Sequence, residues 1–353
     1  CDIVSLTGEN RAIAKCGIEN IKNTGNPGLN ALILESGLKD KNITEYHVGF
    51  VIGPAINATG RLESAELAVS LFIDSDEESC AEKAARLSEM NRERKSITLR
   101  SYEKAIDIIK EEGYESHKVI TVYSGEISES IAGIVAGRVR ETFNRPAVVI
   151  TASGETVKGS ARSIEGYNVF DALLAHSDMF VKFGGHAMAA GFSMDRGSVD
   201  SLREALNIEC ALSHEDFLPV YSIDCELKPE HASYGFAKEM ERLSPFGKGN
   251  PEPLFGIKNL TVNGIRFLGA DKRAVRLDFF GGSSKTALRG LYFGGMESFL
   301  KKISEGYGDD VCDKIALGTV PRLDMDIVFN IGINEFRGEE SVQLIIRDFR
   351  RSK

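Results

Sequence analysis

The stretch from Lys118 to Thr151 reads KVITVYSGEISESIAGIVAGRVRETFNRPAVVIT, and it decides the fold of the middle of the chain. KVITVYS (118–124) and PAVVIT (146–151) are β-branched runs of strand length. The residues between them, ESIAGIVAGRVRETF (129–143), repeat their apolar side chains at helical spacing. Strand, helix and strand in this order predict a βαβ unit, and therefore a parallel or mixed sheet with helices packed on it.

A long helix is predicted immediately upstream of this unit. From Glu77 to about Glu112 the sequence has no Gly or Pro, and apolar residues recur at helical spacing. At 1.5 Å per residue the helix would be roughly 54 Å long, which is too long for one small core. Its middle, NRERKSITLR (91–100), is polar and basic. We therefore expect residues 77–113 to form a rigid connector whose central turns lie in solvent between two bodies.

The regions on either side of this connector differ in the secondary structure that their sequences predict. Residues 1–76 combine a strand-like DIVSL with helices expected at 10–22 and 28–36, followed by GPAINATGRL (53–62) and a helix at 62–73. Residues 114–212 complete the α/β domain with a turn at GSARS (159–163), helices at 167–177 and 199–212, and KFGGHAMAAGFSM (182–194). Residues 213–353 form short alternating segments with Gly-rich turns and one helix at 236–243, which predicts a small all-β sandwich or barrel.

The composition excludes several classes of protein. The 353 residues are 42% hydrophobic, enough for two or three domains with cores of their own. The net charge of −9 argues against a basic surface over the whole molecule, but not against local basic grooves. The six cysteines form no CxxC pair, so reduced thiols are expected rather than a zinc site or a disulfide framework. Neither a membrane span nor a secretory signal is present, which predicts a cytoplasmic protein without a membrane partner.

Two small-residue stretches could hold a phosphate group. In KFGGHAMAAGFSM, Gly184 and Gly185 allow a close approach of backbone N–H groups to a ligand beside His186. A tight strand-to-helix turn, with the histidine bonded to a buried carbonyl, explains the same residues equally well. In GSARS, Ser160 offers a hydroxyl and Arg162 a bidentate guanidinium, although an exposed turn is the simpler explanation.

Two further candidates lie in the N-terminal region. Asn57 and Arg61 are four residues apart in GPAINATGRL, where they could face the mouth of a groove or cap the helix that follows. Asp2 stands beside an apolar segment, where a buried carboxylate needs a partner such as a metal ion. The sequence has no HExxH or paired-histidine cluster to complete such a site. Because the chain opens with Cys1 and runs directly into this segment, we expect it to lack part of its N-terminal end.

The ordered set of motifs resembles the RecJ family of single-stranded-DNA-specific exonucleases, in the DHH phosphoesterase superfamily. The resemblance covers nearly the whole chain, through CDIVSLTGENR, GPAINATGRL, NRERK, SIAGIVAGR, KGSARS, FGGHAMAAGF, LSPFGKGNPEP and NEFRGEESVQLIIRDFR. It implies the end of a DHH catalytic domain (1–76), a connecting helix (77–113), a DHH-associated domain (114–212) and an OB-fold with a basic groove and stacking aromatics (213–353). Ser5, Ser130 and Ala132 depart mildly from the family's pattern, which affects fine geometry rather than membership.

The resemblance also assigns roles to the candidate residues. Asp2 resembles the last ligand of a centre that holds two Mn²⁺ or Mg²⁺ ions, so this chain alone is expected to be inactive. Ser160 and Arg162 resemble a pocket for a 5′-terminal phosphate. Gly184, Gly185 and His186 resemble nucleotide contacts, and Arg61, with Asn57 in the same motif, resembles a residue lining the DNA path. The implied activity is 5′-to-3′ hydrolysis of single-stranded DNA in repair and recombination.

Two other functions remain open at this point. The first is a DHH-type oligoribonuclease or cyclic-dinucleotide phosphodiesterase, which would share the GGH element but not the β-rich tail. The second is a RecJ-like protein that binds nucleic acid without cutting it. Besides single-stranded DNA, the resemblance implies a single-strand-binding protein and a helicase as partners.

Overall fold

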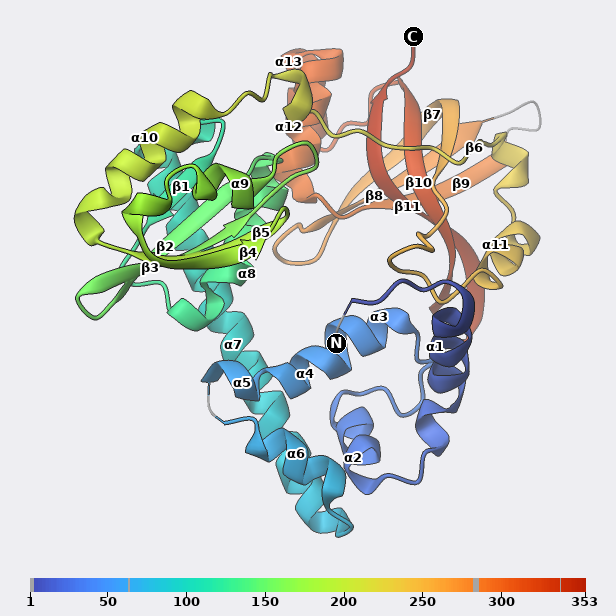
Figure 1. Ribbon diagram of the computed structural model, residues 1–353. Helices are drawn as coiled ribbons and strands as arrows, with labels where there is room; N and C mark the ends of the chain where they lie inside the picture. Colours follow the sequence, from blue (N-terminus) through green and yellow to red (C-terminus); the bar gives the residue numbers. More distant parts are fainter. Residues whose placement is uncertain (1–2, 63, 282–285, 337) are drawn as a thin grey trace. The chain divides into compact units, whose positions relative to one another are not determined.

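A computed structural model of the chain describes residues 3–62, 64–281, 286–336 and 338–353 (Figure 1). The chain divides into two compact units, which are described separately. Unit 1 comprises residues 20–220, and unit 2 combines residues 3–19 with residues 221–353. Among the described residues, no helix is long and apolar enough to span a membrane.

The first part of unit 1 is helical and packs on the beginning of one long helix. That helix, α7, runs from Glu77 to Glu111, as the sequence predicts, and the side chain of Asp76 caps its N-terminus by accepting from the Ser79 N–H. The helices before it are α2 (Pro27–Glu35), α3 (Glu45–His47), a π-helical segment (Val48–Ile52), α4 (Gly53–Asn57), α5 (Thr59–Leu62) and α6 (Glu66–Ile73).

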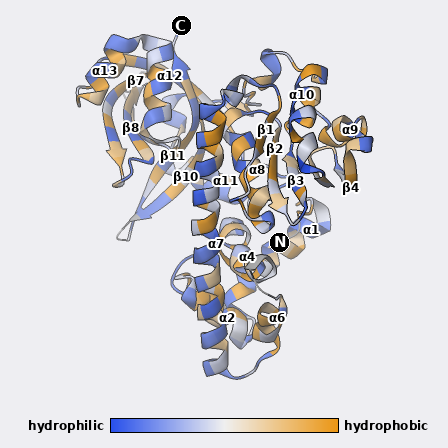
Figure 2. Ribbon diagram, turned by 90° about the vertical axis from the view of Figure 1, so that its left-hand side faces the viewer, coloured by the Kyte–Doolittle hydropathy of each residue, from blue (hydrophilic) through white to orange (hydrophobic). Residues whose placement is uncertain are grey.

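Helix α7 serves two hydrophobic cores rather than one. Near its start, Cys80, Ala84 and Leu87 are buried against the preceding helices, and near its end Ala105 and Ile109 are buried against the α/β domain. Figure 2 shows apolar and polar segments alternating along it. The expected solvent exposure of its middle turns holds only for one face, because Asn91 and Thr98 are buried.

The second part of unit 1 is a five-stranded mixed sheet with the strand order β1-β2-β3-β5-β4. The strands are β1 (Ile120–Tyr123), β2 (Ala147–Ser153), β3 (Thr156–Arg162), β4 (Phe180–His186) and β5 (Ala189–Met194). β1 and β2 are parallel and are joined by α8 (Glu129–Phe143), so the predicted βαβ unit is confirmed. Helix α8 and the end of α7 cover one face, while α9 (Val169–Leu174) and α10 (Val199–Glu209) lie on the other (Figure 1).

Two sequence-based expectations for this sheet were wrong. GSARS does not form a turn but the second half of strand β3, because Gly159 and Ala161 are buried against the α9–α10 side of the sheet. FGGHAMAAGF does not form a strand-to-helix turn either. It forms the β4–β5 hairpin, in which Gly184 pairs with Gly191 and His186 pairs with Ala189.

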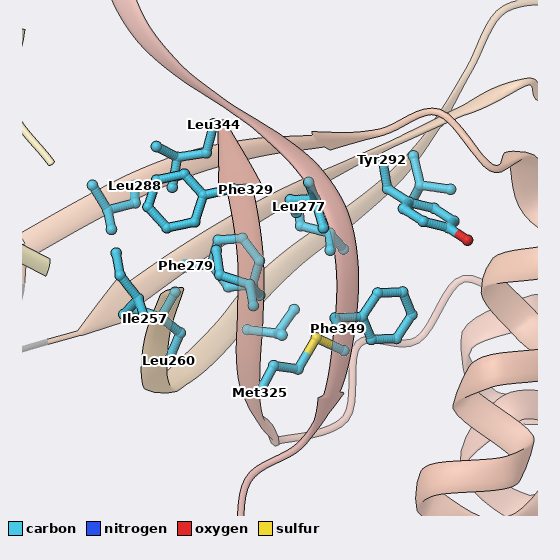
Figure 3. Packing of buried hydrophobic residues seen from close by; sticks show 14 of the residues in the cluster. Ile257, Leu260, Leu277, Phe279, Leu288, Tyr292, Met325, Phe329, Leu344 and Phe349 are labelled. Atoms are coloured by element: carbon cyan, nitrogen blue, oxygen red, sulfur yellow. The ribbon is translucent and has the colours of Figure 1, made fainter. Parts of the chain in front are cut away.

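Unit 2 contains a closed five-stranded barrel. Its strands are β7 (Phe255–Leu268), β8 (Ala274–Gly281), β9 (Thr286–Tyr292), β10 (Leu323–Phe336) and β11 (Glu339–Arg351). Pairing of β10 with β7 closes the barrel, and β9 pairs with β11 in parallel, which is the OB-fold arrangement implied by the resemblance. Figure 3 shows side chains from several strands, including Phe279, Phe329 and Met325, gathered in the barrel core.

Several shorter elements accompany the barrel. Strand β6 (Cys225–Glu226) extends the sheet beside β7, and α11 (Tyr234–Glu241) is the helix predicted at 236–243. Helices α12 (Gly295–Tyr307) and α13 (Asp309–Ala316) connect β9 to β10, and the sequence analysis did not predict them. Helix α1 (Gly8–Asn20) completes the elements of the N-terminal region.

His117, just before β1, should make the stability of unit 1 depend on pH. Burial lowers the pKa of its imidazole, and the nearby charges of Arg203 and Arg145 lower it further. Below its ordinary pKa of about 6.5 the unfolded chain takes up a proton that the folded state resists, so stability is lost as the pH falls. We expect the melting temperature to decrease between about pH 7.5 and pH 5 and His117→Gln to weaken that decrease. Identical pH profiles of the two proteins would contradict this assignment.

Candidate functional site

The strand register brings the two predicted phosphate-binding stretches together on one face of the sheet. Strand β5 lies between β3 and β4 and pairs with both. Residues directly opposite each other on neighbouring strands point to the same face. Three rows therefore cross the strands in the order β3, β5, β4: Lys158–Ser193–Lys182, Ser160–Gly191–Gly184 and Arg162–Ala189–His186.

Helix α8 covers only part of this face. On β2, the partners of Ser160 and Arg162 are Val149 and Ala147, and both are fully buried under α7 and α8. Gly133 of α8 stands directly over β3, since a Cβ atom there would lie 2.7 Å from Nη2 of Arg162 and 3.6 Å from Oγ of Ser160. Most of β4 is exposed. Ser160 and Arg162 therefore lie at the border between the covered and the open parts of the face.

A groove of about 340 Å³ occupies the open part beside Ser160. Gly191 lines the groove next to Ser160 and contributes no side chain, which leaves room next to the serine hydroxyl, and Gly184 is the partner of Gly191 on β4. The ammonium group of Lys158 lies 2.6 Å from Oε1 of Glu129, the first residue of α8. The hydroxyls of Ser160 and Ser193 and the ammonium groups of Lys158 and Lys182 thus line one groove, together with the carboxylate of Glu129, and Arg162 lies two residues beyond Ser160 on β3. Hydroxyl and cationic donors suit an anion.

Four polar or charged lining residues were not identified from the sequence: Glu129, Lys158, Lys182 and Ser193. A period of two residues would have found Lys182, because it precedes Gly184 and His186 by two and four positions on the same strand. Lys158 precedes Ser160 in the same way on β3. The two-residue period applies only to strands, so it could not identify these lysines as long as GSARS and FGGHAMAAGF were predicted to be turns.

The geometry of the β4–β5 hairpin requires a glycine at position 185. Gly185 has φ +154°, and a Cβ atom there would overlap the carbonyl oxygen of Ala189 and lie 2.5 Å from Cα of Ala190. His186 follows it at the end of β4 with an exposed side chain, whose Nδ1 accepts a long hydrogen bond from the Met188 N–H at 3.4 Å. The imidazole is therefore available to a ligand at the end of the Arg162 row, and it is not bound to a buried carbonyl.

The structure describes the candidate residues of the N-terminal region only in part. Asn57 is exposed at the end of α4. Arg61 belongs to α5, which contacts α8, but its side chain lies outside the described residues. The helix expected at 62–73 begins at Glu66 with Ala65 at its N-cap position, so neither position 57 nor position 61 is its N-cap. Asp2 also lies outside the described residues.

The part of the chain that the structure describes does not fit a two-metal centre. Within it, no group of three or more His, Cys, Asp and Glu side chains is arranged to hold a metal ion. We therefore assign no catalytic step to these residues. Their hydroxyl and cationic groups are donors that suit an anion.

The barrel of unit 2 carries many paired charges. Arg276 and Arg289 both bind Asp278, at 3.0 and 3.3 Å. Arg347 pairs with Glu252, and Arg350 pairs with Asp326. Residues 221–353 contain 20 lysines and arginines against 19 acidic residues. A basic groove with stacking aromatics on this barrel therefore stays a prediction.

Gly133→Ala should disturb the anion site without unfolding the domain. The added methyl group would meet the end of the flexible Arg162 side chain, which can move aside, rather than backbone atoms. We expect affinity for a phosphate-bearing ligand to fall about threefold to tenfold, because the guanidinium loses its alignment with Ser160. Titration with a phosphorylated oligonucleotide measures this, and Gly137→Ala on the same helix, where a Cβ atom meets nothing within 4 Å, is the control. A Gly133→Ala chain that binds as tightly as the control would argue against the site.

Two protein-family models match consecutive parts of the chain. Residues 116–211 match the DHHA1 domain, and residues 223–348 match the RecJ OB domain. Among curated proteins, the single-stranded-DNA-specific exonuclease RecJ of Bacillus subtilis is 33% identical over 98% of this chain and 42% of its own length. The RecJ of Haemophilus influenzae is 30% identical over 98% of this chain and 59% of its own length.

A solved structure agrees with these matches. The crystal structure of RecJ from Thermus thermophilus in complex with Mg²⁺ superposes with a TM-score of 0.80 at 25% identity, over 100% of this chain and 50% of that one. The chain thus spans about half the length of the relatives that it matches. Family matches over consecutive regions, relatives aligned along nearly all of the chain and a shared fold together show that the chain belongs to the RecJ family.

Proposed function

We propose that the chain is the substrate-holding part of a RecJ-type exonuclease that degrades single-stranded DNA from its 5′ end. The observation that carries this proposal is the set of three rows across β3, β5 and β4, which places cationic and hydroxyl donors around one open groove. Relatives that align with 98% of the chain are named single-stranded-DNA-specific exonucleases, which supports this substrate over other anions.

In this proposal the groove binds the 5′-terminal phosphate. The guanidinium of Arg162 and the hydroxyl of Ser160 donate to its oxygens, and Lys182 adds a positive charge on the same face. The first nucleotide lies over Gly184 and Gly185, where the absence of side chains admits a sugar or base close to the backbone, and His186 contacts it at the strand end. Fixing the 5′ end in this way presents the first linkage at a constant position, which is an orientation effect.

Hydrolysis itself belongs to a centre that the described residues do not form. Solved RecJ relatives contain Mg²⁺ or Mn²⁺, and we propose that Asp2 contributes to such a centre in the complete protein. Two divalent cations there would activate water and stabilise the leaving oxygen. The residues of this chain hold the strand in place, so the chain alone should bind DNA without cutting it.

The proposed function is tested by comparing 5′-phosphorylated and 5′-hydroxyl single strands of one sequence. Fluorescence anisotropy with the 353-residue chain should show about tenfold tighter binding of the phosphorylated strand, since charge-assisted hydrogen bonds are involved. The affinity for both strands should decrease as salt increases. Equal affinities would contradict the phosphate pocket. Preference for a cyclic dinucleotide or a short oligoribonucleotide over long DNA would favour the other DHH-type activity instead.

Experiments on the complete gene product distinguish the exonuclease function from a function in DNA binding alone. The enzyme requires a DxD and an Asp-His-His motif in the gene product outside this chain, and we propose that the product acts in the cytoplasm in repair and recombination. A single-strand-binding protein and a helicase are its proposed partners, and single-stranded DNA is its proposed substrate. A gene product that lacks those motifs and leaves single-stranded DNA intact with Mn²⁺ would indicate the non-catalytic function.

A further inference from the structure

A second feature of the chain is the contact of its N-terminal segment with the OB-fold unit. Residues 3–11, here called the strap, lie against residues 242–250, here called the cradle, within unit 2. The Leu6 N–H donates to the Lys248 carbonyl at 2.7 Å. The cradle contains the SPFGKGN sequence, which the phosphate site does not use.

Arg11 fastens the strap to the end of helix α11. Its Nη2 donates to the Leu243 carbonyl at 2.8 Å and lies 3.3 and 3.4 Å from the carbonyls of Ser244 and Arg242. These carbonyls directly follow α11, at the helix end where carbonyl groups lack intrahelical partners and the helix dipole is negative. One guanidinium from the strap therefore satisfies three acceptors of the cradle.

The two glycines of the cradle make room for the strap. Gly249 has φ +77°, and a Cβ atom on it would overlap Oγ of Ser5. A Cβ atom on Gly247 would lie 2.8 Å from Cδ1 of Leu6. The Asn250 side-chain amide holds the cradle in shape by donating to the carbonyls of Leu243 and Pro245, each at 2.9 Å. Shape, backbone pairing and charge thus all match the cradle to this one segment.

We propose that the cradle anchors the strap so that residues 3–11 keep a fixed position on the OB unit, with Arg11 as a positioning residue. The inference rests on the proposed function, because it assigns the anchored segment to the catalytic part of the complete enzyme. Helix α1, which begins within the strap, has no buried residue, so it gives the strap no hydrophobic core of its own. The cradle supplies the contacts that order it, in the way that supporting residues orient a site.

Hydrogen exchange on the 353-residue chain tests the anchoring without any catalysis. In Arg11→Ala, the Leu6 amide should exchange about tenfold or more faster, because its hydrogen bond to Lys248 opens more often. Arg242→Ala is the matched control, since it removes a neighbouring arginine whose side chain pairs locally with Glu239, at 2.7 Å. Equal exchange in the two variants would overturn the anchor.

A second pair of variants distinguishes loss of the contact between Gly249 and the strap from the backbone strain of an alanine at positive φ. Gly249→Ala and Gly269→Ala both place alanine at positive φ, at +77° and +80°, but a Cβ atom at position 269 meets nothing within 4 Å. Only Gly249→Ala should release the strap. Ser5→Ala added to Gly249→Ala should restore slow exchange, because it removes the overlapping Oγ. A strap that is equally ordered in both glycine variants would contradict the proposed fit.

The complete gene product tests the positioning role. Arg11→Ala and Gly249→Ala should each lower kcat for single-stranded DNA about tenfold or more, while the Kd for DNA stays within about twofold, because positioning affects the chemical step rather than binding. Variants that free the strap but keep kcat would overturn this role alone. A wild-type product that does not cut single-stranded DNA would overturn the proposed function and this role together, while the exchange experiment would still report on the anchor.

Discussion

An Arg162→Ala chain is expected to bind 5′-phosphorylated and 5′-hydroxyl single strands with equal affinity. Arg162 stands in the row that ends at His186, beside Ser160 and under Gly133 of α8. Its guanidinium is the only side chain of these three rows that can donate two parallel hydrogen bonds to one phosphate. Loss of such charge-assisted bonds should weaken binding of the phosphorylated strand about 10- to 100-fold and leave the hydroxyl strand nearly unchanged.

Two further variants sharpen this experiment. Arg162→Lys should recover part of the preference, because it keeps the charge but not the paired geometry. Arg196→Ala removes an exposed arginine that lies over the Tyr123 ring, 5.1 Å from its centroid and outside the groove, and should bind like the unaltered chain. If Arg162→Ala retains a phosphate preference while its circular dichroism spectrum is unchanged, the phosphate does not bind at this row.

Gly185→Ala is expected to disrupt the β4–β5 hairpin and with it the whole site. The methyl group would collide with backbone atoms of the partner strand, at the Ala189 carbonyl oxygen and the Ala190 Cα, which cannot move without breaking the strand pairing. The residue would also have to keep a φ of +154°. Strain of this kind costs about 1–3 kcal/mol before the clash is counted, so we expect a melting temperature lower by several degrees.

The neighbouring glycine provides a matched comparison. A Cβ atom on Gly184 meets nothing within 4 Å, so Gly184→Ala should melt like the unaltered chain. It should still weaken DNA binding, because the methyl group enters the row beside Ser160. Thermal unfolding and anisotropy measured on both variants would therefore separate the folding role of the motif from its binding role. Equal melting temperatures for the two variants would contradict the clash.

The regular elements could be predicted from the sequence because each has a strong local signal. Helix α8 has both of its predicted ends, Glu129 and Phe143, and α7 follows from a long run without Gly or Pro. Helices α12 and α13 were missed because glycines at 294, 295, 308 and 318 flank them and suggested turns. The spacing of Phe299 and Ile303, both fully buried, was the available helical signal.

The site could be predicted as a set of residues but not as a geometry. GSARS looked like a turn because its residues are small, yet Gly159 lies under the Phe192 ring, whose position a Cβ atom would overlap. This cross-strand packing sustains the strand where intrinsic propensity does not. The pairing of Ser160 with Gly191, and of Gly191 with Gly184, depends on the register between β3, β5 and β4. The sequence of each strand alone does not predict that register. Lys158 and Lys182 become part of the site only through that register.

The unbroken course of α7 has a consequence for how unit 1 unfolds. The same helix supplies Cys80, Ala84 and Leu87 to the core of the helical part, and Ala105 and Ile109 to the core under the sheet. Helix formation is cooperative, so melting one half removes the hydrogen-bonded neighbours on which the other half depends. The two cores should therefore be lost in a single thermal transition, which makes unit 1 one cooperative folding unit with two hydrophobic centres.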